Sequence, residues 1–562
     1  MRKILLRIFF TICFLLLVSR LTAQQEKVPI DHQVYIFIKE MSVKNILGFI
    51  HDDSPGMSRA EVRKYLGLIS SCSSEISATE KNLLRKFQNE FYDDQADSTN
   101  TFQLLGKSAG FSTDRSDLFS DKTKYIYAYR SDGANYYLNV LGRALYGQNL
   151  EPYVNNSWLY DIGFRFRGTL FDKLGYSLTV QKGGVSGSSE FAPTLDPRLK
   201  YNFKYVENYE NISNYDFTEG YMRYYTEPLK DMSLSFQLGR EKIKFGYGYG
   251  SKLILSGNHP VLDFFKMDFN YGIFSFTSLH ASTVGDFSIE RELNYTKFIA
   301  INRFKLHFDN VIEFGLGENI IYSGRGIDLA YFNPLAFYKF EEMSLQDRDN
   351  GALWLDFQTH PIKNLELQGT YFLDDNPLGN LQDFSNFINK TGYQLGAFWY
   401  SPFSIDDLSF ILEYTRIRPY VYSHTNPKNS YTAWNQILGH QIGPNSDEIF
   451  TRIAYNVNDW IRLNFDYRYI RHGENIYDSQ GALSFNAGGD AFVPHRTNID
   501  PVRIEFLDGE RINTNIFTIG FRFEPVRQFI FDLVLVEVMK KNITHDISDN
   551  SGYAYLKMMF EM

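Results

Sequence analysis

The spacing between apolar residues divides the chain into two parts. Between about residues 28 and 95 they recur every three to four positions, as on one face of a helix. From about Tyr125 onward the period becomes two, which is typical of strands with one apolar and one polar face. The pattern therefore predicts a small helical portion followed by a large β-structure.

The first period predicts three amphipathic helices. One helical face carries Val34, Phe37, Ile38 and Met41. Two Ser-x-x-Glu pairs have the spacing of a capping box, in which serine and glutamate satisfy the first backbone N–H groups of a helix: Ser58 with Glu61, and Ser77 with Glu80. These helices are too polar to enter lipid, so we expect a small bundle in water.

The second period predicts a membrane barrel. In "YDIGFRFRGTLF" (160–171) one face carries Tyr160, Ile162, Phe164 and Phe166, and the other carries Asp161, Gly163, Arg165 and Arg167. Short turns (456–460, 524–528) alternate with long polar loops (184–215, 473–512), as in outer-membrane barrels. The expected fold is mainly β, a large antiparallel transmembrane β-barrel of roughly 16–20 strands with a small N-terminal α-helical domain.

Composition supports this fold. Aromatic residues make up 17% of the chain while the mean hydropathy is only −0.30, which suits aromatic girdles outside a barrel and polar groups inside it. The net charge of −9 excludes a basic footprint for nucleic acid. Of the two cysteines only Cys72 lies outside the predicted signal peptide, so no intramolecular disulfide is expected in the mature chain.

The first residues predict export. A basic start is followed by an apolar stretch from Ile8 to Val18 and then by "LTA". This order is typical of a secretory signal peptide, with cleavage expected after Ala23. The expected organisation is a signal peptide (1–23), a periplasmic helical domain with a connector (24–120) and an outer-membrane barrel (121–562).

The glycine-rich stretch "FGYGYGSKLILSGNHP" (245–260) differs from the known nucleotide-binding motifs. Its G-x-G-x-G spacing differs from the dinucleotide fingerprint, and Gly250-Ser251-Lys252 lacks the Gly-Lys-Ser/Thr order of a phosphate loop. Read as a strand, it places the glycines on one face and Tyr247 and Tyr249 on the other. Two interpretations remain: glycines facing a plug, or a sugar-facing wall beside Asn258 and His259.

No catalytic or metal motif is evident. Glu341 and Glu342 are adjacent, so on a strand they point to opposite faces and cannot act as a glycosidase pair. The histidines show no metal-ligand spacing such as H-x-x-x-H. We therefore expect no enzyme, no cofactor and no metal.

Three ordered blocks resemble the Wzi family of capsule-assembly outer-membrane proteins. They are "FGYGYGSKLILSGNHPVLDFF", "GRGIDLAYFNPLAFYKFEE…RDNGALWLDFQ" (324–358) and "EYTRIRPYVYSHTNP…LGHQIGPNSDEI" (413–449). Phe245 stands where the family commonly has tryptophan, so the chain is similar to a divergent member.

The resemblance implies a lectin-like barrel that binds, attaches or organises exported surface polysaccharide without catalysis. The candidate glycan contacts are Tyr247, Tyr249, Asn258, His259, Arg325, Asn333, His424, His440, Asn445 and Asp447. The expected partners are surface polysaccharide, the lipid bilayer and, through the helical domain, periplasmic or export-machinery proteins, but not nucleic acid. Two alternatives stay open, a general porin or nutrient channel and the barrel partner of a surface-motility or secretion complex. The helical domain is expected either to plug the periplasmic mouth or to dock partners.

Overall fold

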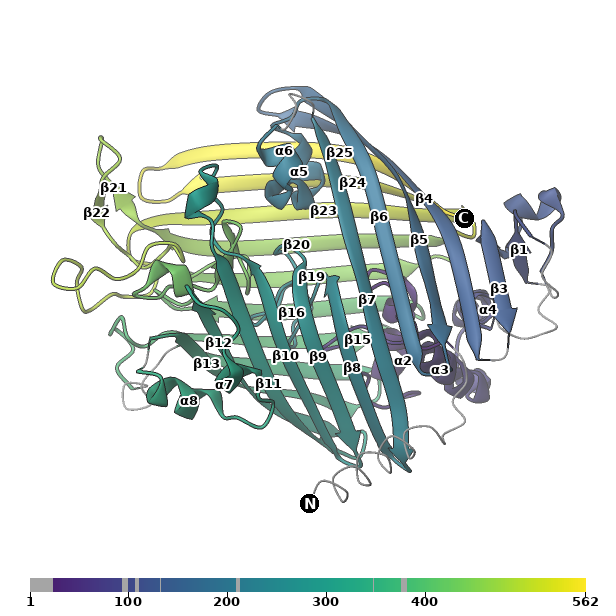
Figure 1. Cartoon of the computed structure of the whole chain (residues 1–562). Helices are drawn as coiled ribbons and strands as arrows, with labels where there is room; N and C mark the ends of the chain where they lie inside the picture. The colour runs from purple at the N-terminus through teal and green to yellow at the C-terminus, as the bar shows by residue number, and fades with distance from the viewer. Residues whose placement is uncertain are drawn as a thin grey trace, which may run out of the picture.

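A computed structural model describes residues 24–92, 100–106, 111–131, 133–208, 213–346, 348–374 and 382–562. The predicted signal peptide lies outside these residues. The described chain forms a closed antiparallel barrel of 18 long strands, with the N-terminal helices at one end (Figure 1). The predicted fold class and strand range are confirmed.

The long strands follow one another around the barrel in chain order. They are β4 (Ala134–Glu151), β5 (Asn155–Leu170), β6 (Leu174–Gly187), β7 (Asn214–Leu229), β8 (Met232–Glu241), β9 (Leu262–Tyr271), β10 (Phe274–Val284), β11 (Thr296–Phe308), β12 (Ile312–Ser323), β13 (Asn350–Ile362), β14 (Leu365–Asp374), β15 (Thr391–Tyr400), β16 (Leu408–Ile417), β19 (Ser446–Asn456), β20 (Ile461–Glu474), β23 (Glu510–Val526), β24 (Phe529–Asn542) and β25 (Ile547–Glu561). The barrel closes where β25 pairs with β4, and the short β3 (Tyr127–Ser131) pairs with the start of the same strand.

Smaller elements lie between the barrel strands or precede them. They are β1 (Thr101–Gln103), β2 (Thr123–Tyr125), α5 (Ala192–Leu195), α6 (Phe203–Val206), α7 (Leu329–Phe332), α8 (Tyr338–Ser344), β17 (Thr432–Ala433), β18 (Gln436–Ile437), β21 (Ile476–Tyr477) and β22 (Leu483–Phe485).

The alternation of residue types places apolar side chains outside and charged ones inside. On β5 the outward residues Tyr160, Ile162 and Phe164 are exposed. The inward Arg167 is buried and donates to Glu26 of the N-terminal segment at 2.7 Å. On the neighbouring strands β24 and β25, Phe529 stacks on Phe560. This arrangement suits lipid outside and polar contacts in the lumen.

The two ends of the barrel differ in their connections. Tight turns such as 230–231, 272–273, 363–364 and 527–528 lie at one end, which we call the tight-turn end. At the other, the long-loop end, lie the connections 188–213, 242–261, 324–349, 418–445 and 475–509. Outer-membrane barrels have short turns on the periplasmic side and long loops outside the cell.

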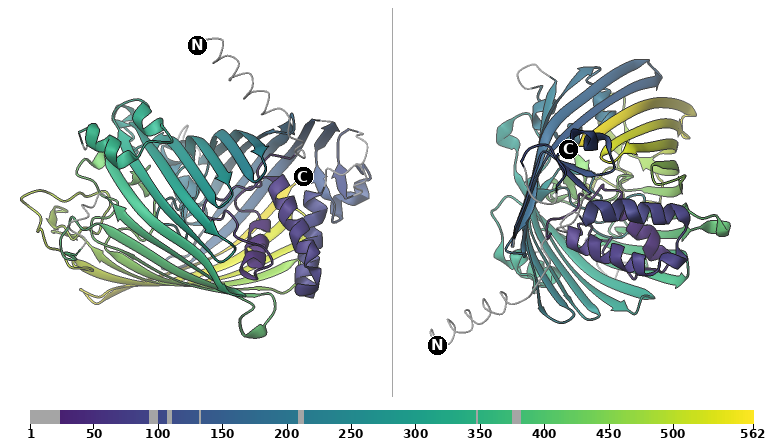
Figure 2. Two further views of the ribbon diagram at one scale, coloured as in Figure 1. Left: turned by 90° about the horizontal axis from the view of Figure 1, so that it is seen from below. Right: turned by 90° about the vertical axis from the view of Figure 1, so that its right-hand side faces the viewer.

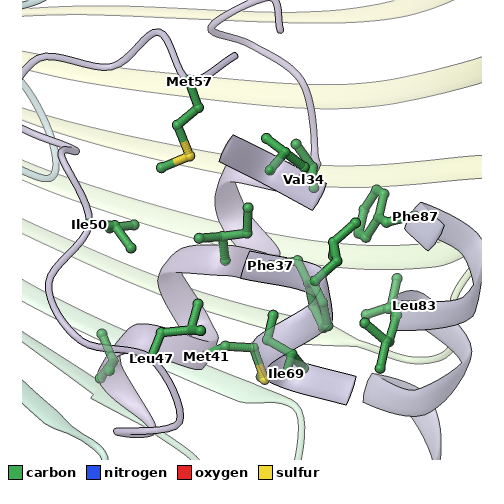
Figure 3. Close-up of a cluster of buried hydrophobic side chains, with 14 of the residues drawn as sticks. Val34, Phe37, Met41, Leu47, Ile50, Met57, Ile69, Leu83 and Phe87 are labelled. Carbon is green, nitrogen blue, oxygen red and sulfur yellow. The ribbon is translucent and has the colours of Figure 1, made fainter. Parts of the chain in front are cut away.

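The N-terminal segment (24–92) lies at the tight-turn end. It contains α2 (Val34–Val43), α3 (Arg59–Ser71) and α4 (Ala78–Phe91), and both predicted capping boxes are present. Figure 2 looks into this end of the barrel, with the helices at its opening. Their apolar faces form one buried cluster (Figure 3), which also includes Phe398 and Tyr400 of the barrel wall. No helix among the described residues is both long and apolar enough to cross a membrane.

One local expectation from the sequence is wrong. Residues 245–260 form no strand of the barrel; they belong to the irregular connection between β8 and β9. Glu341 and Glu342, considered above as strand residues, lie in the short helix α8 of the connection between β12 and β13, because the Asn-Pro before it ends the preceding turn and a helical run follows.

Candidate functional site

The connection between β8 and β9 folds into the barrel, and we call residues 242–261 the plug loop. Gly246 and Gly248 have φ values of 97° and 135°, which are strained for residues with a side chain. A Cβ on Gly248 would lie 2.1 Å from the carbonyl oxygen of Ser251. The glycines therefore permit tight turns of a loop, rather than marking one face of a strand.

The two tyrosines of this motif bind the barrel wall. The Tyr247 hydroxyl donates to Glu313 on β12, and the Tyr249 hydroxyl donates to Glu366 on β14 at 2.7 Å. The backbone N–H groups of Tyr249 and Gly250 donate to Glu413 on β16 at 2.7 and 2.9 Å. These hydroxyls are engaged inside the molecule, so the structure gives Tyr247 and Tyr249 a role in fixing the plug loop.

The N-terminal segment meets the plug loop in the lumen. The backbone N–H of Gly246 donates to the carbonyl oxygen of Asp53 at 2.8 Å. The buried Asp53 carboxylate accepts hydrogen bonds from Arg303, and from Lys305 at 2.9 Å, both on β11. Lys39 of α2 forms an ion pair of 2.5 Å with Glu366. The N-terminal segment, from the tight-turn end, and the plug loop, from the long-loop end, thus contact each other and the same barrel wall.

Above the plug loop, residues 418–445 and 475–509 form what we call the outer cap. Tyr422 donates to the Leu253 carbonyl at 2.8 Å, which ties the cap to the plug loop. Leu253 and Leu255 pack with Tyr431, Leu438 and inward wall residues in one buried cluster. The described residues therefore fill the lumen at the long-loop end with packed side chains.

Several predicted glycan contacts belong to this closure. Asn445 is fully buried and its side-chain amide donates to the carbonyl oxygens of Gly473 and Asp508 at 2.9 and 3.0 Å. His440 is buried in the same layer, and its backbone N–H donates to Tyr422 at 3.2 Å. His424 is also buried, with its ring Nδ1 in a turn around Asn426.

The remaining predicted contacts lie apart from one another. His259 is buried in the plug loop, its ring nitrogens 2.7 and 3.1 Å from the Pro260 and Ile243 carbonyls, and the neighbouring Asn258 is half-buried. Asp447 lies on the outer rim, paired with Arg471. Two more lie in the connection 324–349: Arg325, paired with Asp349, and Asn333, which caps a turn. The ten predicted residues do not form one site.

Two cavities flank the N-terminal segment at the tight-turn end. The larger, of about 290 Å³, lies between α2, α4 and strands β19, β20, β23, β24 and β25, and the smaller has about 80 Å³. In the larger cavity Arg522 is paired with Asp532, and Arg452 with Asp466. Its charges are thus compensated within the protein. No group of metal-ligating side chains occurs among the residues that the structure describes.

The long-loop end carries a partly exposed cluster of arginines and aromatic rings that the sequence did not predict. Residues 384–387 run antiparallel to 502–504, with the Ile504 N–H donating to the Ser385 carbonyl at 2.8 Å. Beside this pair, the Arg418 guanidinium lies 5.5 Å from the Phe384 ring centroid and the Arg416 guanidinium 3.8 Å from that of Phe506. We call Phe384, Phe506, Arg416, Arg418 and Arg503 the arginine–aromatic patch.

The patch is cationic and only partly open to solvent, because Arg418 is 7% exposed and its Nε donates to the Asn389 carbonyl oxygen at 3.1 Å. The Phe384 ring is 66% exposed, and Arg503 is exposed beside Asp383 at 3.4 Å. Burial lowers the pKa of Arg418, and the neighbouring charge of Arg416 lowers it further. Two arginines that repel each other favour an anion between or above them. Aromatic faces with planar donors can bind the C–H faces and carboxylates of acidic sugars.

One signal in the sequence points to the patch. Arg416 and Arg418 are two residues apart at the end of an alternating strand pattern and just before a long loop. Residues so spaced share one side of an extended chain at the rim of a barrel. The aromatic partners come from other loops, and no local pattern reveals that pairing.

Comparison with known proteins gives a family and a fold. A family profile described as "Capsule assembly protein Wzi" matches residues 146–523. A solved structure of Wzi from Escherichia coli, described as a carbohydrate-binding β-barrel involved in group 1 capsule assembly, has a TM-score of 0.57 and 14% identity and covers 95% of this chain and 99% of its own. Among curated proteins none matches this sequence.

More distant barrels also align. OprD from Pseudomonas aeruginosa has a TM-score of 0.42 and 10% identity, covering 76% of this chain and 95% of its own. OccAB4 from Acinetobacter baumannii has a TM-score of 0.43 and 9% identity, covering 76% and 97%. These two likenesses say nothing about function.

Proposed function

The chain belongs to the Wzi family of capsule assembly proteins, and from that premise we propose that it holds exported surface polysaccharide at the cell surface through its long-loop end. It is an outer-membrane barrel of the family fold. The observation that carries the proposal is the outer cap, which closes the lumen beneath loops that expose the Phe384 ring and Arg503. A closed lumen favours a holding role over a diffusion pore.

Within this function, the arginine–aromatic patch is our candidate contact for the glycan. Its three arginines and two phenylalanines supply charge and flat apolar faces on the side where long loops meet the outside. A polysaccharide containing uronic acids fits this chemistry better than a neutral one. The predicted residues in the plug loop and outer cap would then support the patch from below.

We propose a non-enzymatic role. The adjacent Glu341 and Glu342 lie in α8, and Glu342 is buried and paired with Lys339 at 2.7 Å. Such a pair offers no second carboxylate across a cleft for glycoside hydrolysis.

The N-terminal segment has two roles in the proposal. Its ion pairs with the wall support a brace that closes the periplasmic mouth. Its outer face, including the exposed Lys81 and Arg85 of α4, is left for periplasmic or export-machinery proteins. Stoichiometric co-purification of such proteins with the intact chain, lost when α4 is made acidic, tests this second role.

Binding of polysaccharide extracted from the surface of the producing cells tests the main proposal. We expect immobilised polysaccharide to bind the purified barrel, and the double variant Arg416→Ala/Arg503→Ala to bind at least about ten-fold more weakly, since loss of a charge-assisted contact costs about 1.5–3 kcal/mol. The matched control is Arg85→Ala, an exposed arginine at the other end of the barrel. Equal binding by both variants would place the glycan elsewhere, and no binding by the native chain would refute the function.

A further inference from the structure

The connection between β12 and β13 does not project from the barrel as the other long loops do. Residues 324–346, which include α7 and α8 and which we call the flap, fold back onto the outside of the barrel wall. Figure 2 shows the two short helices outside the wall, at the end away from α2 to α4. The contacts of the flap are with outward-facing residues of β9 to β12.

The outward direction of these wall residues follows from their neighbours. Arg303 and Lys305 on β11 bind Asp53 in the lumen, so the alternate residues Asn302 and Phe304 point outside. On β12 Glu313 accepts from Tyr247 in the lumen, so the alternate residue Glu318 also points outside. These strands therefore carry polar side chains on the face where other strands meet lipid.

The flap covers those polar residues and satisfies them. Glu318 is 4% exposed and accepts a hydrogen bond from the Tyr338 N–H of α8 at 2.9 Å. Asn302 is fully buried and donates to the Ala336 carbonyl at 3.2 Å. An outward carboxylate or amide in the middle of a spanning strand is costly in hydrocarbon unless it is covered and paired.

The opposite side of the flap is apolar. Leu335, Leu329 and Phe340 are 86%, 78% and 75% exposed. Other large exposed side chains on the same stretch are Ile327, Phe332, Phe337 and Met343. A surface of this kind is rare in water and marks an interface.

The apolar side of the flap is continuous with the lipid-facing wall. Phe332 packs against Phe265, an outward residue of β9, at 5.6 Å between ring centroids. Below the flap, outward residues of the same strands are exposed and apolar, among them Phe304 and Leu316. Two ion pairs within the connection 324–349, Arg325–Asp349 and Lys339–Glu342, neutralise four of its charges locally.

We propose that the flap is a membrane-embedded part of the wall, whose apolar side contacts the acyl chains of the outer leaflet. It replaces the polar outer surface of β10 to β12 with an apolar one. The occupant is lipid rather than a second protein because the apolar surface joins the membrane-facing wall without a break and because the wall beneath it is otherwise unsuited to lipid.

Quenching by lipid chains tests the proposal. In a Cys72→Ser background, single cysteines at Leu335 and Phe340 are labelled with an environment-sensitive fluorophore, and the refolded barrel is placed in vesicles containing phospholipid with nitroxide-labelled acyl chains. Leu355→Cys, outward and exposed on β13, is the lipid reference, and Ile499→Cys, exposed in the connection 475–509, is the water reference.

We expect the labels at positions 335 and 340 to be quenched within two-fold of the label at 355 and several-fold more than the label at 499. Quenching at 335 and 340 no stronger than at 499 would overturn the proposal, and would assign the apolar side to a partner protein instead. Heat-modified gel mobility of each variant checks that the barrel has folded.

Discussion

The carboxylate of Asp53 is one of the links between the N-terminal segment and the barrel wall. It is buried and binds both Arg303 and Lys305, while its backbone carbonyl accepts from the plug loop. Arg303 keeps a second partner in Asp356, and Lys305 keeps one in Glu313. Loss of Asp53 therefore weakens the pairing of both cations without abolishing it.

We predict that Asp53→Ala lowers the free energy of unfolding by an amount near the lower end of the about 3–5 kcal/mol that breaking a buried ion pair costs. Equilibrium unfolding of the refolded barrel in urea measures it. The matched control is Asp546→Ala, whose side chain is 85% exposed and pairs with Lys541. A change at Asp53 no larger than at Asp546 would show that the ion pairs do not hold the segment.

His32 and Glu90 give the N-terminal segment a dependence on pH. Their side chains lie 3.0 Å apart. Burial opposes the charge on His32, but the charge and hydrogen bond of Glu90 outweigh burial and raise its pKa above 6.5. Burial would raise the pKa of Glu90, but His32, Arg527 and Arg59 lower it to about 2.

The directions of these two pKa shifts predict the pH range over which the pair stabilises the N-terminal segment. The raised His32 pKa contributes stability that is fully present below pH 6.5 and is lost as pH rises through the folded-state pKa. The lowered Glu90 pKa contributes stability present above pH 4.5 and lost as pH falls toward 2. Amide hydrogen exchange of α4 should therefore quicken at alkaline pH beyond the intrinsic rate, and His32→Gln should remove that alkaline change. An unchanged profile in His32→Gln would contradict the assignment.

At the scale of elements, the plug loop depends on backbone conformations that only glycine adopts easily. We predict that Gly248→Ala destabilises the loop by at least about 1–3 kcal/mol, the cost of a non-glycine residue held in a sparsely populated conformation. Its φ of 135° and the approach of the Ser251 carbonyl supply the strain. Gly326→Ala, where an added Cβ meets nothing within 4 Å, is the control. The midpoint of heat-induced unfolding compares them, and equal midpoints would contradict the role given to Gly248.

The elements could be predicted from the sequence where a period or a cap is local. Alternation along 160–171 gave the inner and outer faces of β5, and Ser58 and Ser77 gave the starts of α3 and α4. The alternation of glycine and tyrosine at 245–260 predicted a strand wrongly, because the glycines there form turns with positive φ. The site residues are less predictable, since Asn445 and His440 resemble ligand contacts until the loops that bury them are known.

At the scale of the whole molecule, the lumen of the barrel is closed at both ends. The N-terminal segment enters at the tight-turn end, the plug loop and outer cap fill the long-loop end, and the two meet at Asp53 and Gly246. The flap continues the wall on the outside. In our proposal, a polysaccharide at the arginine–aromatic patch binds to the outside of a closed barrel and does not thread through it.

Single-channel conductance of the intact, refolded chain in a planar bilayer tests this account most directly. We predict no steady openings, since packed side chains and buried ion pairs fill the lumen. Insertion is verified by protease protection of the same sample. Steady conductance of porin size from the intact chain would contradict the closed barrel, and would make a diffusion channel the better account of this protein.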